Sequence, residues 1–274
     1  MVGWSGQNRV TVSILPSTTY FASNNTNNAA PLDLRDLNPA NPAILDSRGV
    51  NLNDITQGAL GDCFLLSAIG SMAQRTPQAV LDLFVYPPVA NGYVSVRIYR
   101  EIGADPVMVR VRRTLDFGIS QARLSNDYFD AGNVRYYEIW TQLLEKAYAQ
   151  YFGWERVING GSAFRVWQHF TGQATQVVVA SNQTIPQITT ALRNAVSAGQ
   201  KVILSTHNNL ESEWRVTIPG DPNPYTIISG HAYVVQSIDA NDIVTLYNPH
   251  GPEAFPPRFR LADFKEYFWR IQKQ

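Results

Sequence analysis

The sequence predicts an α+β protein of two lobes, the first mainly helical and the second mainly β, with a cleft between them. In the first half, apolar residues after Cys63 recur at helical spacing, and residues 138–153 form a second amphipathic run. In the second half, short β-branched and aromatic stretches alternate with Gly, Pro, Asn and Asp. That pattern is typical of a largely antiparallel sheet.

The composition favours a soluble globular protein. Its 274 residues are 45% hydrophobic, enough for one large core or two smaller ones. Lys plus Arg equals Asp plus Glu at 22 each, so no charge excess points to nucleic acid. No apolar run is long enough to span a membrane, and the N-terminus lacks a signal-peptide pattern. One cysteine excludes an internal disulfide and fits a reducing compartment. We expect a cytoplasmic monomer, with export by another route left open.

The chain divides into three segments. Residues 1–44 are expected to form an extended lead, because they are rich in Asn, Ser and Pro. Residues 45–171 form the helical lobe, which also contains a strand pair at 93–100 and 107–113. Residues 172–274 form the β-rich lobe, which opens with a helix over 186–198 that Thr184 caps and Gly199 ends.

Cys63 follows a Gly-rich turn and opens a helix. Helix N-termini stabilise a thiolate through unpaired N–H groups and the positive end of the dipole, so we expect a reactive sulfur. Asp62 and Gly61 fit the turn and N-cap, and Gln57 lies one loop upstream, where its amide can reach an oxyanion. The alternative is a buried free cysteine that opens a core helix. The Gln–turn–Cys arrangement favours the nucleophile.

The stretch DITQGALGDCFLL resembles the calpain family of cysteine peptidases, whose signature reads DICQGALGDCWLL. Two downstream pieces also resemble the family in the same order. SGHAY (229–233) is similar to KGHAYS, and YNPHG (247–251) is similar to RNPWG. The helix segment EIWTQLLEKAYAQ is similar to EFWSALLEKAYAK. The resemblance covers roughly residues 45–270 and implies a papain-like two-lobed protease core with its active site in the cleft.

The resemblance implies a Cys-His-Asn triad of Cys63, His231 and Asn248. His231 opens an apolar strand after a Ser-Gly turn, and Asn248 ends the next strand before a proline. Cys63 would attack the scissile carbonyl as a thiolate paired with imidazolium, and His231 would protonate the leaving amine and then activate water. The backbone N–H of Cys63 and the side chain of Gln57 would hold the oxyanion. Because Cys63 and His231 lie on different lobes, activity would require the cleft to close.

Calcium is an expected ligand by the same resemblance, in the first lobe only. Asp54 and Glu138 fall at the family's carboxylate positions, and Gly49 can give a carbonyl. A turn aspartate and a glutamate at a helix start remain the alternative. The second-lobe match fails. The loop of the second lobe keeps Glu253 as its only acid, and Arg258 stands where a calcium-binding carboxylate is expected. Leu52 is near the place of the family's arginine that links the two calcium sites.

Two aromatic positions also depart from the family. Phe64 replaces the tryptophan after the nucleophile, and His250 replaces the tryptophan of NPWG, which shields the active-site hydrogen bond. The leading interpretation is a calpain-like cysteine endopeptidase acting on peptide or protein substrates. The alternatives are a catalytically weak pseudo-protease that only holds a peptide, and a thiol acyl transferase of transglutaminase or deamidase type.

Overall fold

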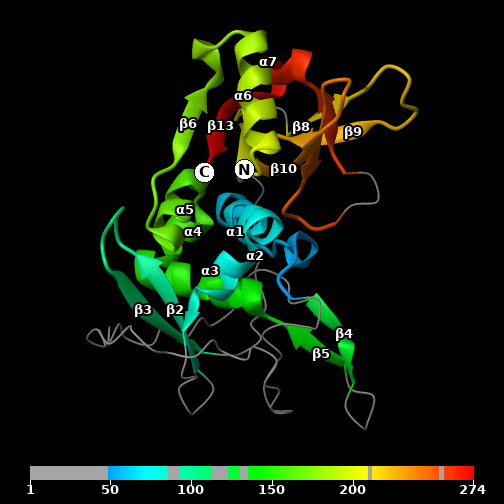
Figure 1. Ribbon diagram of the computed structural model, residues 1–274. Helices are drawn as coiled ribbons and strands as arrows, with labels where there is room; N and C mark the ends of the chain where they lie inside the picture. The colour runs from blue at the N-terminus through cyan, green and yellow to red at the C-terminus, as the bar shows by residue number, and fades with distance from the viewer. Residues whose placement is uncertain (1–48, 86–92, 113–122, 130–134, 209–211, 253–255) are drawn as a thin grey trace.

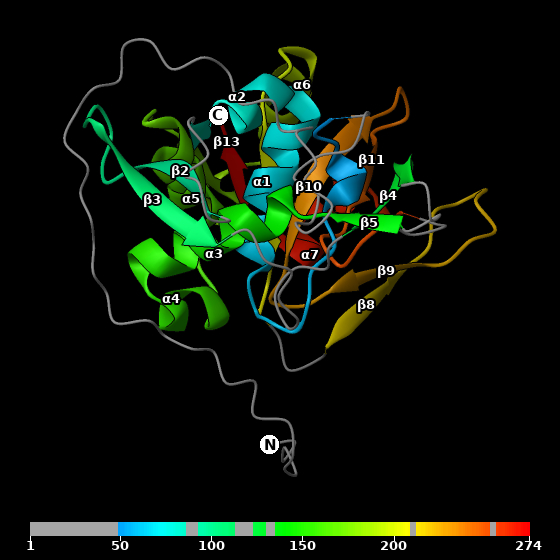
Figure 2. The same ribbon diagram turned by 90° about the horizontal axis from the view of Figure 1, so that it is seen from below.

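The computed structural model describes residues 49–85, 93–112, 123–129, 135–208, 212–252 and 256–274. In Figure 1 the helices of the first half lie below a twisted sheet, and a long helix (α6, Ile185–Ser197) covers the other side of that sheet. Figure 2 shows the hairpin β2–β3 (Tyr93–Tyr99, Pro106–Arg112) and the hairpin β8–β9 (Glu213–Val216, Tyr225–Ile228) on opposite sides of the molecule. This mixed, two-part architecture confirms the predicted α+β class.

The first half is built around one helix that packs against several others. The helices are α1 (Cys63–Arg75), α2 (Pro77–Leu81), α3 (Trp140–Phe152), α4 (Trp154–Ile158) and α5 (Ala163–Thr171), with the 3-10 turn η1 (Leu52–Asp54). The strands are β1 (Phe84–Val85), β2, β3, β4 (Arg123–Phe129) and β5 (Arg135–Glu138). In α1 almost every residue after Phe64 is buried, because α3, α5 and the sheet surround it.

The second half is a six-stranded antiparallel sheet with the order β12-β11-β10-β7-β13-β6. Its strands are β6 (Gln176–Val179), β7 (Val202–Thr206), β10 (Ala232–Ile238), β11 (Ile243–Tyr247), β12 (Arg258–Arg260) and β13 (Phe268–Lys273). The helical pieces are α6, α7 (Phe264–Tyr267), η2 (Ala180–Asn182) and η3 (Leu261–Asp263).

Strand β10 joins two hydrophobic cores. Side chains alternate across a strand, so Ala232 and Val234 enter the core around α1, whereas Tyr233 and Val235 enter the core beneath α6. All four are at most 4% exposed. The helical half is therefore packed directly onto one face of the sheet.

Several local predictions are confirmed, and one is wrong. Thr184 and Gln187 form a capping box at the start of α6, and Gly199 follows that helix with a left-handed φ of 68°. Glu138, however, ends strand β5 rather than heading α3, which begins at Trp140. Asp62 occupies the N-cap of α1 as predicted, although its side chain makes no capping hydrogen bond.

The proposed lead, residues 1–44, lies outside the described residues. The proposed limit between the lobes falls where α5 ends at Thr171 and Gly172 adopts a φ of 67°. No helix in the described part of the chain is both long and apolar enough to cross a membrane.

Candidate active site

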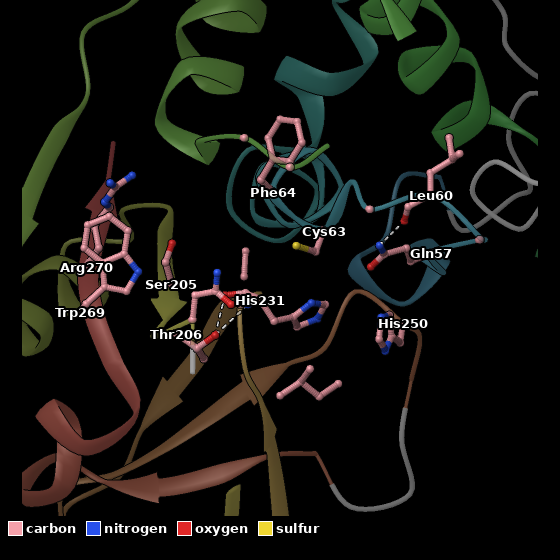
Figure 3. Close-up of a pocket in the computed structure, with 18 of the residues that line it drawn as sticks. Gln57, Leu60, Cys63, Phe64, Ser205, Thr206, His231, His250, Trp269 and Arg270 are labelled. Carbon is pink, nitrogen blue, oxygen red and sulfur yellow. Dashed lines mark hydrogen bonds between the residues drawn. The ribbon is translucent and has the colours of Figure 1, made fainter. Parts of the chain in front are cut away.

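Cys63, His231 and Gln57 line one cleft of about 610 Å³ between the helical half and the sheet. Figure 3 shows the sulfur of Cys63 at the start of α1 and the ring of His231 on the opposite wall, with Gln57 and His250 toward one end. Trp269 and Arg270 stand at the other end. The structure thus brings together the predicted nucleophile, base and oxyanion residue.

The position of Cys63 follows from the docking of α1 on β10. One turn after Cys63, the Ser67 hydroxyl donates a hydrogen bond of 2.9 Å to the Ala232 carbonyl, and both groups are buried. Residues four apart lie on the same helix face. Cys63 therefore faces the beginning of β10, where His231 immediately precedes Ala232.

The His231 ring is oriented by Asn248. His231 Nε2 lies 2.9 Å from Asn248 Oδ1, and the backbone N–H of His250 donates to the same oxygen at 3.1 Å. The backbone N–H of His250 can only donate, so this amide atom is the oxygen, and His231 must carry its hydrogen on Nε2 to bond to it. In the neutral ring the lone pair is then on Nδ1. The two side chains are only 7% and 5% exposed, so little water competes for the bond.

The backbone at His231 is equally well fixed. Gly230 has a left-handed φ of 62°, which favours glycine at the turn that leads into β10. The His231 N–H donates to Thr206 Oγ1 at 2.7 Å, and the Thr206 N–H donates to the His231 carbonyl at 3.0 Å. Strand β7 thus holds His231 in place through Thr206, a residue that the sequence patterns did not single out.

The electrostatics differ from the predicted thiolate–imidazolium pair. Burial raises the pKa of the Cys63 thiol to about 11, and backbone N–H groups of Ala232, Phe64 and Cys63 offset only part of that rise. Burial also lowers the pKa of His231 to about 4; the bond to Asn248 acts against this, and the nearby His250 adds to it. In the described part of the chain, no hydrogen bond joins the Cys63 sulfur to the His231 ring. The expectation of a lowered thiol pKa is wrong for this conformation, because desolvation outweighs the helix terminus.

The Gln57 loop is tied to the sheet on the side of Asn248. The Gln57 N–H donates to the Pro249 carbonyl at 2.7 Å, and the Tyr247 hydroxyl donates to the Ile55 carbonyl at 2.7 Å. Within the loop, Gln57 Nε2 donates to the Leu60 carbonyl at 2.6 Å. A carboxamide has two N–H groups, so one remains for a ligand in the cleft.

A buried pair of acids lies next to Cys63. Asp62 and Glu145 are both fully buried. Burial, and then the nearby charge of Glu145, raise the pKa of Asp62 to about 9. Asp62 is therefore protonated at neutral pH. The pair depends on the packing of α1 against α3, so only the folded chain reveals it.

The predicted calcium ligands are only partly described. Asp54 Oδ2 accepts hydrogen bonds from the Asn51 N–H at 2.8 Å and Trp140 Nε1 at 3.2 Å, and the residue is 2% exposed. Asp54 thus already stabilises the turn before Gln57. Gly49 has open space around it and a φ of 70°. The structure describes the backbone of Glu138 but not its side chain.

The described residues contain no cluster of three or more His, Cys, Asp or Glu that could hold a metal ion. In the second lobe, Arg258 pairs with Asp221 at 2.9 Å and with Asp239 at 3.7 Å. The positive charge between Asp221 and Asp239 is therefore the guanidinium of Arg258. Glu253 lies outside the described residues.

The two aromatic substitutions have different surroundings. A Cβ on Gly161 would lie 2.5 Å from the Phe64 ring, so glycine is needed for Phe64 to pack there. His250 is exposed, and its ring centroid lies 4.7 Å from that of His231 at a tilt of 51°. His250 thus contacts the base without covering it as a flat apolar shield.

The comparisons with known proteins identify the family. A family model described as calpain family cysteine protease matches residues 29–260. Calpain-9 of Homo sapiens is 26% identical over 220 residues, which cover 74% of this chain and 29% of that protein. The calpain-1 catalytic subunit of Sus scrofa is 31% identical over 197 residues, or 68% of this chain and 25% of that protein. The chain thus spans less than a third of these relatives.

Among solved structures, the active wild-type interpain A cysteine protease of Prevotella intermedia superposes with a TM-score of 0.40 and 11% identity. The superposition covers 87% of this chain and 97% of that one.

Proposed function

Because this chain belongs to the calpain family of cysteine proteases, we propose that it is an endopeptidase that cleaves protein substrates with Cys63, His231 and Asn248. The observation that carries the proposal is the 2.9 Å bond between His231 Nε2 and Asn248 Oδ1, in a cleft that Cys63 also lines. That bond leaves Nδ1 of His231 as the nitrogen able to accept a proton.

The reaction starts from a neutral thiol and a neutral imidazole. His231 Nδ1 takes the thiol proton as the Cys63 sulfur attacks the scissile carbonyl, and the C=O electrons move to oxygen. The tetrahedral intermediate collapses, the C–N bond breaks, and the proton on Nδ1 goes to the leaving amine. Water then attacks the thioester, with His231 as the base, and the acid product leaves as the thiol is restored. Asn248 holds the ring throughout.

The oxyanion is held by two donors. Cys63 is the first residue of α1, so its N–H has no acceptor within the helix. The second N–H of Gln57 is the other donor, and its loop is anchored to Pro249. Loss of one oxyanion donor typically lowers kcat by about 10²–10³-fold.

Calcium remains part of the proposal in a limited form. Two carboxylates and a carbonyl, from Asp54, Glu138 and Gly49, would hold one ion in the first lobe and order the Gln57 loop. Calcium prefers six to eight oxygen ligands, and Asp54 already accepts two hydrogen bonds. We therefore propose weak binding that is not required for the chemistry.

The proposal is tested by incubating the protein with casein and a primary amine. A peptidase releases fragments, an acyl transferase forms amine adducts, and a peptide-binding pseudo-protease gives neither. Cys63→Ala is the control, because it removes the nucleophile and keeps the fold of α1. Fragment release by the wild type and none by Cys63→Ala supports the proposal; equal proteolysis by both proteins contradicts it.

A further inference from the structure

A β-bulge shapes the end of the cleft that lies away from Gln57. Along a regular strand, consecutive side chains point to opposite faces. In the pairing of β13 with β7, however, Phe268 lies opposite Thr206 and Arg270 lies opposite Ser205, so Trp269 is an extra residue. Bulges re-aim side chains in this way beside active sites. As a result, Trp269 and Arg270 both line the cleft, although they are consecutive residues (Figure 3).

Trp269 supports the guanidinium of Arg270. The Arg270 Cζ lies 3.7 Å from the centroid of the Trp269 ring, a short distance for a cation–π contact. Arg270 Nη1 also donates to Ser162 Oγ, at a long 3.3 Å. These contacts restrict a long side chain that would otherwise lose much rotamer freedom on binding a ligand.

No carboxylate neutralises Arg270. In the described part of the chain it forms no ion pair, and its Nε is buried without a hydrogen-bond partner. Burial lowers the pKa of Arg270, and no neighbouring acid opposes the shift. An unpaired, partly desolvated charge is costly. The other described residues that line the cleft carry no fixed charge, so the site presents one cation to a ligand.

A bound chain would pass this cation. Ser205 and Thr206 lie between Cys63 and Arg270 in Figure 3, whereas Gln57 and His250 lie on the other side of the sulfur. A peptide with its scissile carbonyl at Cys63 and its carbonyl oxygen toward Gln57 therefore extends one of its arms along β7 to Arg270.

We infer that Arg270, held against Trp269, is a specificity residue that selects a peptide with an acidic side chain on this arm. The inference rests on the proposed peptidase function for the identity of the ligand as a peptide. A guanidinium pairs with a carboxylate through two parallel N–H···O bonds, which gives both attraction and geometric selection. A glutamine in the peptide has the same shape as glutamate, but its amide carries no negative charge.

The test measures binding without cleavage, in the Cys63→Ala background. Fluorescent peptides carry Glu, or Gln in its place, at one position at a time on either side of a fixed central residue, and anisotropy gives Kd. One position should favour Glu by about tenfold or more, as expected for a hydrogen bond to a charged group. Arg270→Gln should reduce the ratio at that position to about one. Arg215→Gln, the same change at an exposed residue of β8 outside the cleft, should keep it.

Two results would overturn the inference: equal Kd values for Glu and Gln at every position, or a Glu preference that persists in Arg270→Gln. If Arg270 only bridges the lobes through Ser162, then Arg270→Gln and Ser162→Ala should weaken Glu and Gln peptides alike. Cleavage of the same peptides by the wild type is scored separately. Cleavage without a Glu preference refutes this inference alone, whereas a Glu preference in binding without cleavage refutes the peptidase alone.

Discussion

Alkylation of Cys63 tests whether the free protein contains a preformed thiolate. Cys63 is the only cysteine in the chain, so the rate reports on one thiol. Burial raises its pKa to about 11 and lowers that of His231 to about 4. At pH 7 both groups are then neutral. The experiment adds iodoacetamide at a series of pH values and follows the rate at which Cys63 is alkylated.

The expected rate follows from the two thiol pKa values. At pH 7 about one in 10⁴ Cys63 thiols is ionised, against about 3% for free cysteine with a pKa of about 8.5, a roughly 300-fold difference. The higher pKa makes each thiolate more nucleophilic, by about tenfold for a Brønsted coefficient of about 0.45. Cys63 should therefore react about 20- to 30-fold more slowly than free cysteine.

Intact-mass spectrometry measures the rate, with the urea-unfolded protein as the reference for an exposed thiol. The folded rate should rise about tenfold per pH unit between pH 7 and 9, because the thiolate fraction does so while the pH stays below the pKa. His231→Gln should leave the rate nearly unchanged, since the ring does not pair with the sulfur in this state. A folded rate above that of free cysteine at pH 7, reduced by His231→Gln, would refute the reasoning and restore the ion pair.

Three further results are expected. Asn248→Ala should lower kcat/KM by about 10- to 100-fold, which corresponds to the loss of a hydrogen bond to a charged ring. The activity of His231→Ala should fall to the Cys63→Ala background. Wild-type kinetics for Asn248→Ala would end the triad assignment. The raised pKa of Asp62 makes wild-type stability fall as pH rises above about 4, its unfolded value, so the difference in Tm in favour of Asp62→Asn should grow from pH 5 to pH 8. Parallel pH profiles of Tm would contradict the raised pKa. Calorimetry should show at most one weak calcium site, absent in Asp54→Ala, and chelator should leave activity; two sites, or complete dependence on calcium, would contradict the limited role.

The parts of the fold that sequence alone predicts are those set by local chemistry. The capping box of Thr184 fixes the start of α6, and Gly199 marks its end. The Gly-rich turn before Cys63 and the proline after Asn248 mark where a helix starts and a strand stops. These signals also place Cys63 and Asn248, because both of these proposed catalytic residues stand at such ends.

The features that sequence does not predict depend on contacts between distant segments. Glu138 has helical neighbours on its C-terminal side, but pairing of β5 with β4 draws it into a strand. The acid pair of Asp62 and Glu145 requires α1 to pack on α3, and burial there reverses the pKa shift expected for Cys63. The bulge at Trp269 arises from the register between β13 and β7, which are far apart in the chain.

The placement of β10 in two cores changes what closure of the cleft involves. From sequence, nucleophile and base belong to separate lobes that must approach each other. In the structure, α1 already packs on β10 through Ala232 and Val234, and Ser67 bonds to that strand one turn after Cys63. Moving α1 away would expose this apolar surface and break a buried hydrogen bond, which costs stability. For the proposed reaction we therefore expect Cys63 to pair with His231 through local shifts of side chains and of the Gln57 loop, rather than through separation and rejoining of two bodies.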